Sequence, residues 1–142
     1  MREILFKAKR KDWRNLPKGE WWVEGYYVKY QPCASISEYV YGIVPAYASA
    51  LYIIEIDPTT LCQYTGLTDK NGKKIWENDI CDRKEKYPEI VAYNKGDWQL
   101  DYSYAFGKEM HSNACNLGFY AYERNCVEVI GNIFDNAELL EV

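Results

Sequence analysis

The sequence predicts a mainly β domain, of the barrel or sandwich-like kind, with very little helix. Aromatic residues make up 16% of the chain, including 14 tyrosines, and such side chains suit pleated, half-buried surfaces. Short runs of alternating apolar and polar residues recur along the chain, separated by Gly, Pro and Asn-Gly turn signals. A length of 142 residues is that of one ordinary domain. We therefore expect a single domain over 1–142, with two small β subdomains meeting around 58–63 as the alternative.

Each expected strand is a short apolar or aromatic run that ends at a turn signal. Ile4, Phe6 and Ala8 alternate with their neighbours in the first strand, and Pro17 and Gly19 mark the turn after it. The remaining expected strands, in chain order, are 20–30, 38–44, 51–57, two strands around Asn71-Gly72 (the second being 74–81), 89–94, 98–106, 119–122 and 126–134.

Three further local signals refine this outline. Gly25 interrupts the long aromatic strand, where a glycine favours a bulge or a sharp bend. Residues 107–118 have no periodicity and are expected to be irregular. Residues 135–140 are expected to form one helical turn, with Asp135 or Asn136 as its N-cap.

The stretch YTGLTDKNGKKIWENDI contains the strongest hairpin signal. Asn71 and Gly72 both tolerate positive φ, which favours a type I′ turn between two strands. Tyr64 and Trp76 would then be packed aromatic side chains. Gly66 is expected where the backbone needs conformational freedom.

A calcium loop is the first alternative for this stretch. Its spacing places Asp69 and Asn71 at two ligand positions. Leu67 and Asn78, however, fall where a ligand oxygen and a bidentate carboxylate are required. We therefore expect no metal site and no cofactor.

Catalysis is the second alternative. Glu77 and Asp79 would share one exposed face of a strand, whereas glycosidase carboxylates flank a bond from distant segments. Asp79 is instead expected to accept backbone N–H bonds near the hairpin. Cys115 lies four residues from His111, but nothing singles out the third group that a Cys–His pair needs. The sequence thus predicts no catalytic residues and no enzyme activity.

Charge is unevenly distributed. Residues 1–20 hold seven of the 17 basic residues and three acidic ones, a net +4, which leaves −8 for the rest of a chain of net −4. Basic side chains beside an aromatic one are what single-stranded nucleic acid requires. The candidate binding residues are Lys7, Lys9, Arg10, Lys11 and Trp13.

The cysteines and the hydropathy indicate a protein of a reducing compartment. None of the five cysteines forms a CxxC pair. The chain has no apolar run of the length that spans a bilayer, and its first residues do not resemble a secretion signal. We expect a cytoplasmic protein without a membrane partner.

Three ordered blocks carry a family resemblance. The hairpin stretch YTGLTDKNGKKIWENDI is similar to a central signature, FKAKRKD followed by GEWWVEGYYV to an N-terminal pair of strands, and VEVIGNIFDNAELL to a C-terminal element. Together they resemble the YopX family, small proteins of bacteriophages and prophages. Asn78 departs from the pattern, since a Gly is commoner before Asp79, and the segment after Lys11 is longer than usual.

The resemblance implies a mainly β fold with an SH3-like barrel and additional antiparallel strands, a phage origin and action in the bacterial cytoplasm. It carries over no catalytic residue, so its signature residues are expected to be structural: Tyr64, Gly66, Asp69, Asn71, Gly72, Trp76 and Asp79.

The expected function is therefore an accessory, non-enzymatic module that binds a host or phage protein. The alternative is nucleic-acid binding through the basic, aromatic N-terminal strands. Self-association into a homo-oligomer is a further expectation, because sheet edges and exposed aromatic residues invite it.

Overall fold

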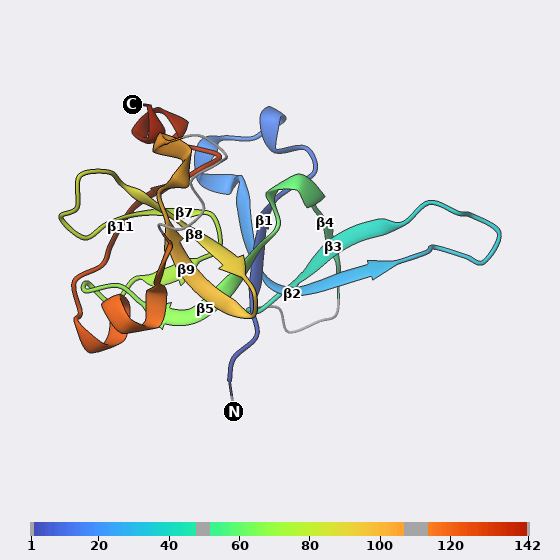
Figure 1. Ribbon diagram of the computed structural model, residues 1–142. Helices are drawn as coiled ribbons and strands as arrows, with labels where there is room; N and C mark the ends of the chain where they lie inside the picture. Colours follow the sequence, from blue (N-terminus) through green and yellow to red (C-terminus); the bar gives the residue numbers. More distant parts are fainter. Residues whose placement is uncertain (1, 48–51, 107–113, 142) are drawn as a thin grey trace. The chain divides into compact units, whose positions relative to one another are not determined.

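The computed structural model describes residues 2–47, 52–106 and 114–141, and they form a mainly β protein (Figure 1). Its strands are β1 (Phe6–Lys9), β2 (Trp22–Tyr30), β3 (Val40–Pro45), β4 (Ile54–Glu55), β5 (Cys62–Thr68), β6 (Lys74–Trp76), β7 (Asp79–Asp82), β8 (Glu89–Asn94), β9 (Asp97–Asp101), β10 (Ala114–Asn116) and β11 (Glu128–Asn132).

In the described residues, helix is confined to short turns. Five are 3-10 turns: η1 (Trp13–Asn15), η2 (Lys18–Glu20), η3 (Pro58–Thr60), η4 (Ser103–Ala105) and η6 (Ala137–Leu140). The sixth, η5 (Phe119–Glu123), is a π-helical turn. No helix in the described part of the chain is long and apolar enough to cross a bilayer.

The strands form two antiparallel sheets, in the orders β4-β3-β2-β1-β5-β6 and β10-β9-β8-β7-β11. Every strand pair is antiparallel. The predicted mainly β class is thus confirmed. Within the described ranges neither sheet closes into a barrel, so the SH3-like barrel stays a prediction.

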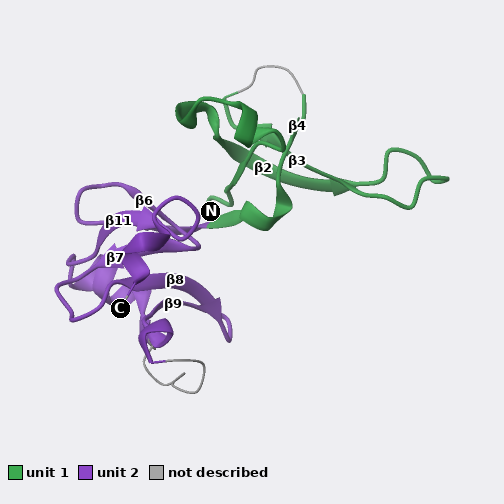
Figure 2. Ribbon diagram, turned by 90° about the horizontal axis from the view of Figure 1, so that it is seen from above, with its two compact units in different colours: residues 1–63 green, residues 64–142 purple. Residues whose placement is uncertain are grey.

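The chain divides into two compact units, residues 1–63 and 64–142 (Figure 2). Each unit has its own core. In the first, Ala8, Val23 and Ile43 are almost completely buried against one another. The prediction of one domain over 1–142 stays a prediction.

The core of the second unit is larger. Strands β7, β8 and β9 contribute Cys81, Val91 and Leu100, and Leu117 and Val127 complete the cluster from the following segments. All five are at most 1% exposed. This core holds the five-stranded sheet against the segment that contains η5.

The expected single strand over 74–81 is wrong, because the structure has two strands there. β6 ends at Trp76, and β7 begins at Asp79 in the other sheet. Between them Asn78 adopts φ 70°, a left-handed conformation that asparagine tolerates better than most residues. Glu77 and Asp79 therefore do not share an exposed strand face. Glycine adopts a positive φ most readily, which fits the Gly that the family resemblance implies at this position.

The predicted hairpin is confirmed, but its turn type is wrong. β5 pairs with β6, and of the two turn residues only Gly72 has positive φ, at 81°. The Asp69 carboxylate accepts the Asn71 and Lys73 N–H groups, which holds Asn71 in an ordinary conformation. A turn with two positive-φ residues occurs instead between β8 and β9, at Lys95 and Gly96.

Other local expectations need correction. Residues 119–122 form η5 rather than a strand: Leu117 and Ala121 are buried four residues apart, and the Asn116 side chain accepts the Phe119 N–H at 2.7 Å. Residues 114–116, expected to be irregular, form β10. The helical turn over 137–140 is confirmed as η6, but it has no side-chain cap bond.

Two strands end earlier than expected. β9 stops at Asp101, where the carboxylate accepts the Ser103 N–H at 2.7 Å and η4 begins. β4 contains only Ile54 and Glu55.

Gly25 does not mark a bulge. Its register with Phe6 on one side and Pro45 on the other is regular. A Cβ at this position would overlap the Val44 carbonyl. Glycine is therefore required by the close approach of β2 and β3.

Candidate functional site

The predicted basic site is built around a lysine that is not available to a ligand. Lys9 ends β1 and is only 2% exposed. Its ammonium nitrogen lies 3.9 Å from the ring centroid of Trp13 and 4.5 Å from that of Trp21. Cation–π contacts of this kind stabilise a charge that has lost water. Lys9 thus acts within the fold of the first unit.

The neighbouring basic residues also have internal partners. The Lys7 ammonium lies 4.7 Å from the centroid of the Trp22 ring. The Arg10 guanidinium donates to the Glu20 carbonyl. Lys11 forms an exposed ion pair with Glu55 at 3.1 Å. These contacts differ from the solvent-facing row of cations that backbone phosphates would need.

Trp13 completes this arrangement. Its indole N–H donates to the Asp57 carboxylate at 3.3 Å, and its ring meets Trp21 edge-on at 4.9 Å. The five candidate residues therefore lie together in the first unit. Lys9 and Trp13 meet as a cation and a ring that face each other.

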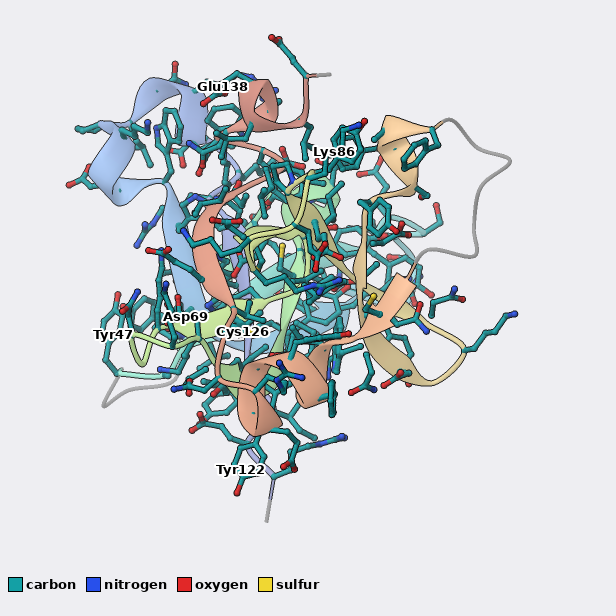
Figure 3. All side chains as sticks on the ribbon, turned by 60° about the vertical axis from the view of Figure 1, so that its left-hand side comes forward. Tyr47, Asp69, Lys86, Tyr122, Cys126 and Glu138 are labelled. Atoms are coloured by element: carbon teal, nitrogen blue, oxygen red, sulfur yellow. The ribbon has the colours of Figure 1, made fainter. Side chains whose placement is uncertain are left out.

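Asp69 is the centre of the hairpin signature (Figure 3). The carboxylate is 4% exposed and accepts three backbone N–H bonds of 2.9 Å, from Asn71, Lys73 and Val129. Burial acts to raise the pKa of Asp69, but these donors outweigh it and hold the pKa below its ordinary value. One carboxylate thus shapes the turn and ties it to β11.

The other signature residues surround this carboxylate or its hairpin. Tyr64 and Trp76 pack with ring centroids 5.4 Å apart, as predicted. Gly66 has φ 85° and lies within the irregular register between β5 and β6, which confirms its need for backbone freedom. Asp79 is 3% exposed and accepts the Trp76 N–H at 2.8 Å. These contacts give each residue a structural role.

The structure describes part of the calcium and Cys–His alternatives. No group of three or more potential ligands in the described ranges could hold a metal ion. His111 lies outside the described residues, so its relation to Cys115 has no description. The Cys115 sulfur instead lies 3.3 Å from Nη2 of Arg83.

The outer half of the β2–β3 hairpin, residues 26–41, consists of exposed and half-buried residues, and we term it the ribbon. Figures 1 and 2 show it extending from the rest of the first unit. β1 pairs with β2 only as far as Gly25, and β4 pairs with β3 only at Gly42 and Ile43. Among the described residues, Tyr26–Tyr30 therefore has β3 as its one partner strand.

Over the paired part of the β2–β3 hairpin, one face carries only aliphatic and tyrosine side chains. The cross-strand register pairs Tyr26 with Val44 and Tyr30 with Val40, so that these side chains lie on the same face as Val28. Tyr26 is 54% exposed and Tyr30 39%. On the opposite face the Lys29 ammonium covers Tyr39 at 4.5 Å. The exposed apolar stripe is the principal candidate site.

Sequence reasoning located β2 and β3 but did not single out this stripe. The alternation of Tyr26, Val28 and Tyr30 was visible, and it is the pattern of any half-buried strand. The open edge beside the stripe depends on where β1 ends. This is a property of the pairing.

The family model and the solved structures both relate this chain to YopX proteins. A family model described as YopX protein matches residues 23–141. The chain is similar in structure to protein EF1440 from Enterococcus faecalis, with a TM-score of 0.54 and 23% identity over 99% of this chain and 100% of that one. It is also similar to protein yopX from Bacillus subtilis, with a TM-score of 0.51 and 18% identity over 100% and 98% of the two chains. No curated protein matches the sequence.

Proposed function

Since the chain belongs to the YopX family, we propose that it is a phage or prophage accessory protein, a non-enzymatic protein-interaction module of the bacterial cytoplasm. The ribbon is the observation that carries this proposal. It combines an apolar face, two half-exposed tyrosines and the edge of Tyr26–Tyr30, beside which β1 does not pair and no other strand of the described residues does either.

The low stability expected of an isolated two-stranded ribbon supports the existence of a protein that binds it. A two-stranded hairpin is marginally stable in water by itself. Exposed strand edges also template pairing with another chain, and proteins that do not use such an edge protect it with charges, prolines or bulges. The segment Tyr26–Tyr30 contains one charged residue, Lys29, and its register with β3 has no bulge.

The partner is therefore expected to add a β-strand along Tyr26–Tyr30. Main-chain hydrogen bonds would supply affinity, and the apolar face would receive alternate side chains of the added strand. Tyrosine is also a frequent energetic centre of protein interfaces. The partner strand is expected to be apolar on one face.

Site-specific photo-crosslinking in the bacterial host tests this function. A benzoylphenylalanine replaces Tyr26, which is 54% exposed on the apolar face of the ribbon. The expected result is one discrete protein adduct, identified by mass spectrometry. The purified partner should then bind the wild type and lose at least about 10-fold in affinity on the double substitution Tyr26→Ser, Tyr30→Ser.

The control places the same crosslinker at Tyr93, which is 58% exposed on β8 of the second unit. Adducts of the same identity from both positions, or affinity unchanged by the double substitution, would refute the ribbon as the binding surface. Melting curves of the variant confirm that the fold is retained.

A further inference from the structure

A concave surface, separate from the ribbon, lies wholly within the second unit. Its cavity of about 330 Å³ is lined by Arg83, Glu85, Lys86, Tyr87, Tyr102, Phe106 and Tyr120. This volume is at the small end of ligand pockets, which are typically aromatic with a few polar groups. Figure 3 labels Lys86 on the segment between β7 and β8.

Three rings of the cavity form a slot. Tyr87 and Tyr102 are nearly parallel, with an interplanar angle of 21° and centroids 6.5 Å apart. Phe106 meets both rings edge-on, at 5.5 Å from Tyr87 and 5.9 Å from Tyr102. A planar group between two rings needs about 7 Å, twice the optimal carbon–carbon contact. Because the 6.5 Å between the centroids is the largest separation that the two planes can have, the rings must move apart by at least about 0.5 Å to accept one.

The charges around the slot balance. Arg83 is held by two carboxylates, with Nε 2.6 Å from Glu89 and Nη1 3.0 Å from Glu85. The guanidinium also lies 4.2 Å from the centroid of the Tyr120 ring. Lys86 is exposed, with its ammonium 5.3 Å from the Tyr87 centroid. Two cations and two carboxylates leave a neutral slot, which favours a neutral guest.

We propose that this slot binds an aromatic side chain of a partner protein segment, inserted between Tyr87 and Tyr102 with its edge toward Phe106. Aromatic rings prefer such stacked and edge-to-face contacts, which add to the burial of their area. The inference deepens the proposed interaction function and rests on it. It assigns the second unit a recognition pocket separate from the ribbon.

Nucleotides fit the slot less well. A nucleobase could stack between the rings, but its phosphate would meet an acidic unit. Residues 64–142 contain nine basic and fourteen acidic residues, a net −5. Nucleic-acid binding usually requires a basic surface at the level of the domain.

Titration with small probes tests the slot without a known partner. The probes are N-acetyl-tryptophanamide for an aromatic side chain, argininamide for a guanidinium and AMP for a nucleobase, each followed by amide NMR shifts. The aromatic probe is expected to bind with a millimolar or tighter Kd, and its shifts should be confined to residues 83–87, 102–106 and 120. Tyr102→Leu should weaken it at least about 5-fold through the lost stacking contact.

The matched control is Tyr93→Leu. Tyr93 also contacts another ring, Trp98 at 4.9 Å, but does not line the cavity. Equal losses from both substitutions, preferential binding of AMP or argininamide, or no shifts at all would overturn the proposal. Because the ribbon assay uses positions in the first unit, failure of the slot and failure of the proposed interaction function are distinguishable.

Discussion

Asp69→Asn is the sharpest test of how the hairpin signature stabilises the second unit. Oδ1 of Asp69 accepts the Asn71 and Lys73 N–H groups, and Oδ2 accepts that of Val129, all at 2.9 Å. An asparagine keeps one oxygen for the turn, but its amide NH₂ then faces the Val129 N–H, donor against donor. The substitution therefore removes the bond between residues 60 positions apart.

The expected loss follows from these three bonds. A hydrogen bond to a charged group contributes about 1.5–3 kcal/mol, and a neutral one about 0.5–1.5 kcal/mol. One charge-assisted bond is lost and two become neutral. We expect the free energy of unfolding to fall by about 3–6 kcal/mol at pH 7. Urea unfolding followed by tryptophan fluorescence measures this loss, and amide exchange at Val129 locates it.

The same substitution predicts a pH dependence. The pKa of Asp69 is lower in the folded protein than its ordinary value, so its contribution is fully present above the unfolded pKa, about 3.9. It is lost as the pH falls through the lower, folded pKa. The difference in stability between wild type and Asp69→Asn should thus be constant from pH 7 to about 5 and shrink below about 4.

Asp82→Asn is the matched control. Its carboxylate also accepts a backbone N–H at 2.9 Å, that of Lys84, but at an exposed site. Its loss should stay below about 1 kcal/mol. Equal losses in the two variants, or a gap for Asp69→Asn that persists undiminished at pH 2, would refute the role assigned to the buried carboxylate.

Three further outcomes are expected. Asn78→Ala should destabilise the protein by about 1 kcal/mol and Asn78→Gly should not, because of the positive φ at this position; thermal melts compare the two. Gly25→Ala should cost about 3 kcal/mol or more, since the new Cβ would overlap the Val44 carbonyl; unchanged unfolding in urea would contradict this. Labelled single-stranded DNA and RNA, titrated with the protein at low salt, should show no salt-dependent binding through the N-terminal strands, because Lys9 is buried against tryptophans. An increase in fluorescence anisotropy at low salt that disappears in the Lys11→Ala variant would reverse that expectation.

Patterns over a few residues were enough to predict much of this protein. Alternation and aromatic content indicated the mainly β class, and Asn71-Gly72 located the β5–β6 hairpin. The packing of Tyr64 on Trp76 and the freedom of Gly66 also followed from the local sequence. These features depend on near neighbours, whose preferences the side chains themselves determine.

What the tertiary structure decided depends on pairing between distant residues. Asp79 belongs to a different sheet from Trp76 because β7 pairs with β8 and β11. The Asp69 carboxylate shapes its turn while it binds Val129, 60 residues away.

The candidate sites were decided in the same way. Lys9 alternates like a solvated strand residue, yet three tryptophan rings surround its ammonium. Among the described residues, the Tyr26–Tyr30 edge of the ribbon is open to another strand because β1 stops pairing at Gly25. The slot exists because strand ends and η5 bring rings from three segments together. A local pattern specifies which side chains share a face, whereas only the tertiary structure determines which edges are paired and which faces are packed.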